Sequence, residues 1–80
     1  MKPLTTEIYI EVRPHPSDKR PGYNVIATRV IKNGDQEDET SVVLNRFRRV
    51  KSKPEHRKQE ANDYALSIAK VFGVMDVRTL

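Results

Sequence analysis

The stretch EIYIEV at residues 7–12 gives the clearest indication of the fold. Its β-branched residues Ile8, Ile10 and Val12 alternate with other side chains, and a period of two is typical of a strand that buries one face. The prolines that follow cannot donate hydrogen bonds to a sheet, so we expect this strand to end near Arg13. The chain therefore begins with a half-buried strand.

Two further strands are predicted, each preceded by a turn. Proline followed by glycine at Pro21-Gly22 is typical of a type II turn, in which the glycine takes a positive φ. Residues 23–31 then predict a second strand. Asn33-Gly34 indicates a hairpin, and the acidic residues after it favour a tip longer than two residues. A third strand is expected over residues 40–50, where a run of apolar residues gives way to alternation and indicates a β-bulge.

A helix is predicted next. Ser52-Lys53-Pro54-Glu55 has the pattern of a capping box, and we expect the helix to run to about Phe72, with Gly73 as its C-terminal cap. Leu66 falls outside the apolar face of this helix. Residues 74–78 are compatible with a short fourth strand. The predicted apolar face consists of Ala61, Tyr64, Ala65, Ile68, Ala69, Val71 and Phe72.

The fold class that follows is α+β. Three strands and then a helix predict a three-stranded antiparallel sheet, in β-β-β-α order, with one C-terminal helix on one face. Eighty residues and 9.3 kDa are enough for a single domain, which we place at residues 1–80. The second face of the sheet is left for solvent or for a partner.

Composition argues against several classes of function. The chain lacks cysteine, which removes disulfides and thiolate chemistry, and it has no apolar run long enough to span a membrane. Its N-terminus lacks a signal sequence, so we expect a cytoplasmic protein. No catalytic or phosphate-loop motif is present, and two distant histidines do not make a metal site. We therefore expect a protein that is not an enzyme and binds no cofactor or metal.

The strongest functional feature is a basic run. Residues 46–58 carry seven cations and one carboxylate, a net charge of +6, whereas the whole chain carries +4. Charge concentrated in this way favours phosphate binding, and arginine offers a planar fork that matches phosphate oxygens. Arg57 and Lys58 would oppose the dipole at the start of the helix, which suggests a use beyond stability. The candidate nucleic-acid-binding residues are Arg46, Arg48, Arg49, Lys51 and Lys53, with Tyr9 and Arg13 beside them.

Strand alternation brings part of this set together. If Ile8, Ile10, Val12 and Phe47 pack against the helix, then Tyr9, Arg13, Arg46 and Arg48 share the uncovered face of the sheet. An aromatic ring among arginines on such a face favours binding of DNA or RNA. The plainer interpretation is that edge strands carry basic residues to prevent aggregation.

Two other kinds of partner remain open. Residues 35–39 hold four carboxylates, which form either a solvated hairpin tip or a contact for a basic protein. On the second interpretation the chain is a non-enzymatic protein-binding module, for example an inhibitor of the kind that phages and mobile elements encode, acting through the acidic hairpin or the open sheet. A homodimer that pairs exposed strand edges or buries Leu66 is the third hypothesis.

The layout over residues 7–72 resembles two kinds of small domain. Integrase arm-binding domains and plant GCC-box-type domains also combine three strands with a helix, and this resemblance implies DNA recognition by the sheet. The size and layout are also similar to small phage-encoded inhibitors of bacterial defence complexes, which implies protein binding. Both resemblances concern layout only, so no base-reading residue can be transferred from them.

Overall fold

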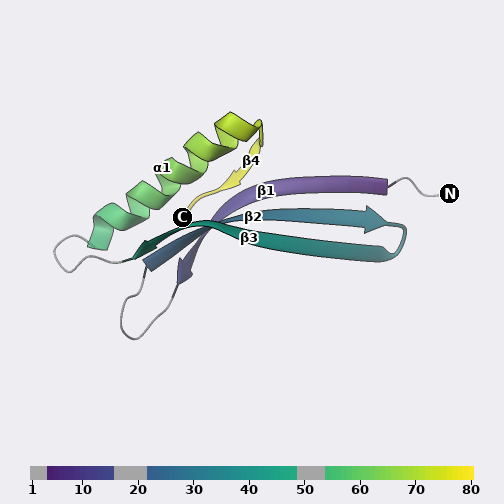
Figure 1. The fold of residues 1–80 in the computed structure, drawn as a ribbon, viewed down its shortest axis with the longest axis horizontal. Helices are drawn as coiled ribbons and strands as arrows, with labels where there is room; N and C mark the ends of the chain where they lie inside the picture. The colour runs from purple at the N-terminus through teal and green to yellow at the C-terminus, as the bar shows by residue number, and fades with distance from the viewer. Residues whose placement is uncertain (1–3, 16–21, 49–53) are drawn as a thin grey trace.

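The computed structural model describes residues 4–15, 22–48 and 54–80, with helix side chains from residue 57 onward. The sheet has the strand order β3-β2-β1-β4, and its pairs are antiparallel except for β4, which runs parallel to β1 (Figure 1). The predicted α+β class is confirmed, and a short fourth strand is present. The elements are β1 (Leu4–His15), β2 (Gly22–Asn33), β3 (Gln36–Arg48), α1 (Pro54–Phe72) and β4 (Asp76–Arg78).

The helix covers only one half of the sheet, and the hairpin half extends past it (Figure 1). Ile10 and Val12 are buried beneath α1, as the alternation predicts. Ile8 lies on the same face but is 51% exposed, so its expected place in the core is wrong. The reason is the length of the strands: alternation sets the face of a side chain, but only the helix decides how much of that face is covered.

Alanines bring the helix close to the sheet. Ala61, Ala65 and Ala69 are fully buried, and small side chains allow a close approach of the two backbones. Val71 and Phe72 were expected on this buried face but are 76% and 67% exposed, so that part of the prediction is wrong. The chain leaves the helix at this point, and the residues that pack against the core after it come from the return to β4.

The helix ends as predicted at Gly73, which takes a φ of 71°. The Val74 amide donates to the Ala69 carbonyl at 2.8 Å, and the Gly73 amide donates to the Lys70 carbonyl at 3.3 Å. This pair of hydrogen bonds is the Schellman motif, which satisfies the last carbonyls of a helix. Ser52 and Lys53 of the predicted capping box lie outside the described residues.

The C-terminal end of β1 and the start of β2 differ from the prediction. β1 continues through Pro14 to His15, where β2 is the only described strand that pairs with it, and an edge position of this kind tolerates proline. Gly22 belongs to β2 and has no positive φ, so the predicted type II turn geometry is wrong. A Cβ on Gly22 would lie 2.2 Å from the Phe47 carbonyl oxygen. Glycine is needed here for close contact between strands.

The hairpin between β2 and β3 is tighter than predicted. Asn33 pairs with Gln36, which leaves a tip of two residues instead of a longer one. Gly34 takes a φ of 63°, and a glycine at the first of two turn positions fits a type II′ hairpin. The predicted bulge is confirmed: the β2–β3 register shifts between Val25 and Ile26, opposite Leu44.

Candidate nucleic-acid interface

We call the side of the sheet turned away from α1 the open face. Cross-strand partners point to the same side of a sheet, so the register decides which residues belong to it. Tyr9, Glu11 and Arg13 of β1 alternate with the core residues Ile10 and Val12 and therefore lie on the open face. This placement of Tyr9 and Arg13 agrees with the alternation of the sequence.

Three strands bring two arginines together across the open face. Asn24 of β2 pairs with Arg13 of β1 on one side and with Arg46 of β3 on the other. Arg48 lies two residues further along β3, opposite Gly22. Phe47, between the two β3 arginines, points to the helix side and meets the Tyr64 ring edge-on, at 5.6 Å between centroids. Phe47 is thus a core residue and does not offer a stacking surface.

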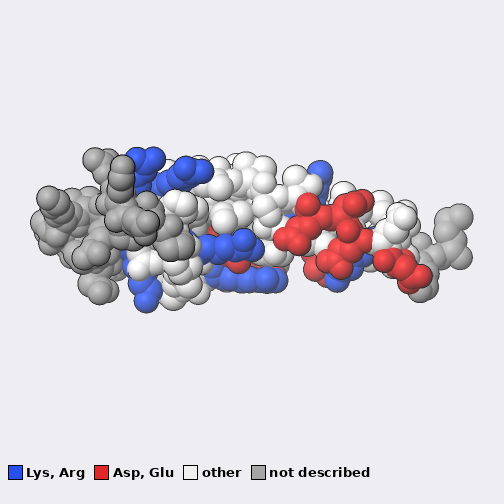
Figure 2. All heavy atoms as spheres, turned by 90° about the horizontal axis from the view of Figure 1, so that it is seen from below, with Lys and Arg blue, Asp and Glu red and all other residues white. Residues whose placement is uncertain are grey.

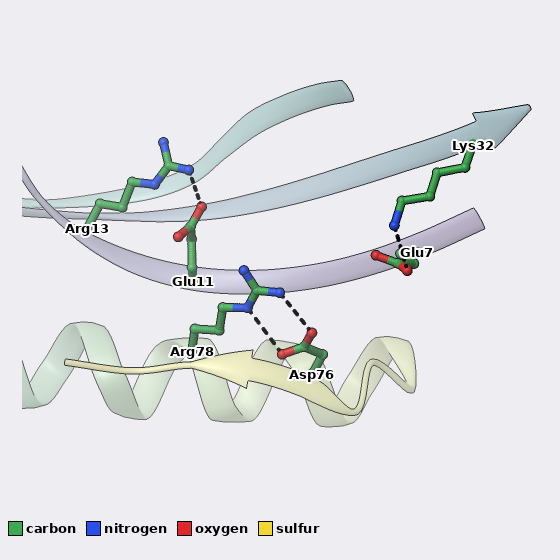
Figure 3. A network of polar contacts seen from close by, with 6 residues as sticks. All are labelled: Glu7, Glu11, Arg13, Lys32, Asp76 and Arg78. Atoms are coloured by element: carbon green, nitrogen blue, oxygen red, sulfur yellow. Dashed lines mark hydrogen bonds and ion pairs between the residues drawn. The ribbon is translucent and has the colours of Figure 1, made fainter. Parts of the chain in front are cut away.

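The arginines of this face differ in their partners. Arg13 forms an ion pair with Glu11, and the hydrogen bond that its guanidinium donates to this carboxylate raises the pKa of Arg13 above its ordinary value (Figure 3). Arg46 and Arg48 are exposed, and no carboxylate of the described residues pairs with either guanidinium. These two side chains are therefore the cations of the open face that remain available to an external anion.

Tyr9 is already engaged by a residue that the sequence prediction left out. The guanidinium of Arg78 lies over the Tyr9 ring at 3.8 Å from its centroid. Asp76 holds Arg78 through two hydrogen bonds of 3.2 and 3.4 Å and raises its pKa (Figure 3). Arg78 adds a fourth strand-borne guanidinium to the open face, and the Tyr9 ring serves as its support.

The open face also contains a buried layer within β2. Ile26, Thr28 and Val30 are buried although they point away from α1. The Thr28 hydroxyl is hydrogen-bonded to the Ser41 hydroxyl at 3.0 Å, which satisfies the buried polar group. The aliphatic stems of long polar neighbours can cover apolar residues while their charged ends stay in water. The open face is thus a packed, charged surface.

Arg57 proves to have a structural role. Its Nε donates to the Arg48 carbonyl at 2.8 Å, and its guanidinium pairs with Glu60. The same guanidinium lies 5.7 Å from the Phe47 ring centroid. These contacts tie the start of α1 to the end of β3, and they explain a cation near a helix start without any ligand.

Charge is segregated along the length of the molecule. Figure 2 views the molecule from the side on which β3 lies, and acidic side chains gather there toward the hairpin end while basic ones gather toward the other. The exposed acidic residues of β3 are Glu37, Asp38 and Glu39, next to the hairpin tip. Arg49, Lys51 and Lys53 of the predicted site lie outside the described residues.

The described residues offer little for other kinds of site. Among residues 4–15, 22–48 and 54–80, no three histidine or acidic side chains are grouped in a way that could hold a metal ion. No described helix is long and apolar enough to cross a membrane. The distinctive feature of the open face is its group of arginine side chains: Arg13, Arg46, Arg48 and Arg78.

Sequence reasoning missed two members of this surface. Arg78 was overlooked because it reaches Tyr9 only through the parallel pairing of β4 with β1, and a three-residue strand carries a weak signal. Asn24 was overlooked because the alternation within β2 is poor. Its Oδ1 is buried and accepts no hydrogen bond from the described residues.

No protein-family model, curated protein or solved structure matches this chain significantly. The likeness in layout to integrase arm-binding and GCC-box-type domains is therefore a likeness of element order alone. Any function has to be argued from the open face itself.

Proposed function

We propose that this chain is a non-enzymatic, cytoplasmic nucleic-acid-binding protein whose open face contacts phosphates through Arg46 and Arg48. The observation that carries the proposal is the state of these two side chains: both are exposed, and neither pairs with a carboxylate of the described residues. A cation that no internal carboxylate neutralises is free to displace counterions from a phosphate backbone.

The neighbouring residues extend this surface. Arg13 lies in the same cross-strand row as Arg46, and the Arg78 guanidinium lies over the Tyr9 ring. Planar guanidinium groups match phosphate oxygens and also stack on bases, so these two residues fit a backbone contact or a base contact. Arg49, Lys51 and Lys53 are further phosphate contacts on this proposal, because they continue the basic run.

A titration at several salt concentrations tests the proposal with duplex DNA and single-stranded RNA as ligands. We expect the affinity to fall steeply with salt for at least one ligand, because each phosphate contact releases counterions. In the double variant Arg46→Gln, Arg48→Gln the affinity should drop for every sequence, and the salt slope should decrease by about two. Absence of binding at low salt would refute the proposal.

A control variant that loses the same number of positive charges distinguishes a defined binding site from attraction to the net charge of the protein. Arg29→Gln, Lys70→Gln also removes two exposed cations, from the helix side of β2 and from α1. This control should leave affinity and salt slope nearly unchanged if the open face is the site. Equal losses in both double variants would indicate attraction to net charge, without a defined surface.

A basic protein is the second candidate partner, and the segregated acidic cluster favours it. Glu37, Asp38 and Glu39 are exposed together at one end of the molecule (Figure 2). Replacing all three with glutamine should leave nucleic-acid binding unchanged or tighten it, because like charges are removed. If the partner is a basic protein, the same variant should associate more slowly with it, and the effect should fade at high salt.

A further inference from the structure

The outer side of β3 is an edge without a described partner strand. β3 is the first strand in the order β3-β2-β1-β4, and it runs from Gln36 to Arg48. All of its residues are exposed except Leu44 and Phe47, which are partly buried. Such an edge presents a row of backbone donors and acceptors that can pair with another strand.

The charges along this edge have a definite order. Glu37 and Glu39 lie on one half of β3, and Arg46 and Arg48 lie on the other. All four point to the open face, because their partners in β2 are all even-numbered positions: Lys32, Val30, Asn24 and Gly22. In β3 the open-face residues are odd-numbered before the bulge and even-numbered after it, because the bulge adds one residue between the two halves.

We propose that the β3 edge pairs with the β3 edge of a second copy of this chain, antiparallel around a two-fold axis at Val42. In this register Glu39 lies opposite the partner's Arg46, and Glu37 lies opposite the partner's Arg48. Each bulge adds one residue between Val43 and Arg46. The acidic half of one copy and the basic half of the other therefore place their charged side chains on the same face of the joined sheet. A two-fold contact of this kind is closed, because it uses the β3 edges of both copies.

The charge pattern selects this arrangement over others. A parallel pairing in register would place Glu37 and Glu39 against the same residues of the second copy, and like charges directly opposite one another repel. Acidic residues and a bulge protect an edge from indiscriminate pairing. Here the same features become complementary when the second strand is reversed.

The shape of the molecule also fits a second copy. The Cα radius of gyration is 14.9 Å, whereas a compact chain of this length has a radius of about 12 Å. The chain exposes 6183 Å² of surface, against about 5000 Å² for a typical monomer of its mass. Pairing along β3 would cover part of this excess.

The dimer does not depend on the proposed nucleic-acid contact, although it uses the same two arginines. Arg46 and Arg48 cannot bind a carboxylate of the partner and a phosphate at the same time. The dimer is therefore tested without nucleic acid, so that failure of one proposal is seen apart from failure of the other.

Sedimentation equilibrium at low salt and submillimolar protein provides the test. The wild type should approach twice the 9.3 kDa of one chain, and high salt should shift it toward the monomer. Two variants reverse one half of the edge each: Glu37→Arg, Glu39→Arg makes the edge wholly basic, and Arg46→Glu, Arg48→Glu makes it wholly acidic. Each variant alone should be monomeric, whereas an equimolar mixture should recover the mass of two chains.

Two single substitutions complete the design. Val42→Lys places like charges at the two-fold axis and should abolish the dimer, while Leu66→Lys changes an exposed apolar residue of α1 and should leave it intact. Circular dichroism establishes that each variant is folded. A monomeric wild type, a mixture of folded reversed variants that stays monomeric, or a dimer lost only in Leu66→Lys would overturn the proposal.

Discussion

The long strands have a helix half, which lies under α1, and a hairpin half, which extends past it (Figure 1). Both halves are paired in the same regular way, but they are stabilised differently. Within β1, Ile10 is 1% exposed under the helix, whereas Ile8, two residues away on the same face, is 51% exposed in the hairpin half. The helix half has a core that strands and helix share. The hairpin half relies on its ladder of backbone hydrogen bonds and on cross-strand pairs such as Lys32 with Glu7.

This difference shows that β-periodicity and burial are separate properties. Alternation of side chains persists wherever a strand is extended, but burial depends on what packs over each face of the strand. Substitutions in the helix half should therefore affect global stability, whereas equivalent substitutions in the hairpin half should have small effects. The following substitutions test this contrast, from the largest expected effect to the smallest.

Ala65→Asp should prevent folding. Ala65 is completely buried between α1 and the sheet, so the new carboxylate would lose its hydration without gaining a partner. Native domains have about 5–15 kcal/mol of stability, and a chain of this size lies toward the low end of that range. Thermal melts followed by circular dichroism should show no cooperative transition. Leu66→Asp at the neighbouring exposed position should still melt cooperatively. A normal melt of Ala65→Asp would show that Ala65 does not lie on the face of α1 that packs against the sheet.

Ile10→Ala and Ile8→Ala compare the two halves directly. Loss of a fully buried isoleucine leaves a cavity, and we expect a cost of about 2–5 kcal/mol for Ile10→Ala. Ile8→Ala removes a side chain that is half exposed, and its cost should stay below about 1 kcal/mol. Urea unfolding measures both values. Equal costs would mean that the hairpin half is covered in solution.

Gly22→Ala and Gly34→Ala compare two glycines that are needed for different reasons. A Cβ at Gly22 would lie 2.2 Å from the Phe47 carbonyl oxygen and 2.8 Å from the Arg48 Cα, so two strands must separate. We expect a cost of about 1–3 kcal/mol, as for other overpacked sites. Gly34→Ala meets open space and is strained only by its positive φ, at about 1–2 kcal/mol. If Gly22→Ala were as stable as the wild type, β2 and β3 would have to lie further apart at Gly22 than in this structure.

Lys32→Ala should have the smallest effect. Its ammonium is 3.3 Å from a Glu7 carboxylate oxygen, but both side chains are about half exposed in the hairpin half. Exposed ion pairs are screened by water and salt, so the expected change is below about 0.5 kcal/mol. Urea midpoints at low and high salt measure it. A larger loss would indicate that the hairpin half contributes more to global stability than its exposure implies.

The local features of this chain were largely predictable from sequence. The C-terminal limit of the helix, the Gly73 cap and the bulge in β3 each depend on a few neighbouring residues, and each is confirmed. The two turns were less well predicted. Gly22 was assigned a turn conformation, but its true constraint is the approach of Phe47 from a strand that is distant in sequence.

The candidate site was predictable in part. Alternation alone places Arg13 and Arg46 on one face. Arg13 follows the core residue Val12 in β1, and Arg46 precedes the core residue Phe47 in β3, on one side of the bulge. Alternation does not reveal that Arg78 covers Tyr9, nor that Arg57 is held by the Arg48 carbonyl. These contacts join segments that are far apart in sequence or belong to different elements.

The amino-acid sequence by itself determined which segments become strands and helix, and which side of β1 and of most of α1 is apolar. Both properties follow from short-range periodicity and from residues with restricted backbones. Only the tertiary structure decided that α1 covers half of the sheet, that Ile8 and Phe72 remain exposed, and that Arg46 and Arg48 lack a carboxylate partner among the described residues. The physical reason is that coverage and charge pairing depend on where separate elements meet in space, and no local pattern encodes those distances.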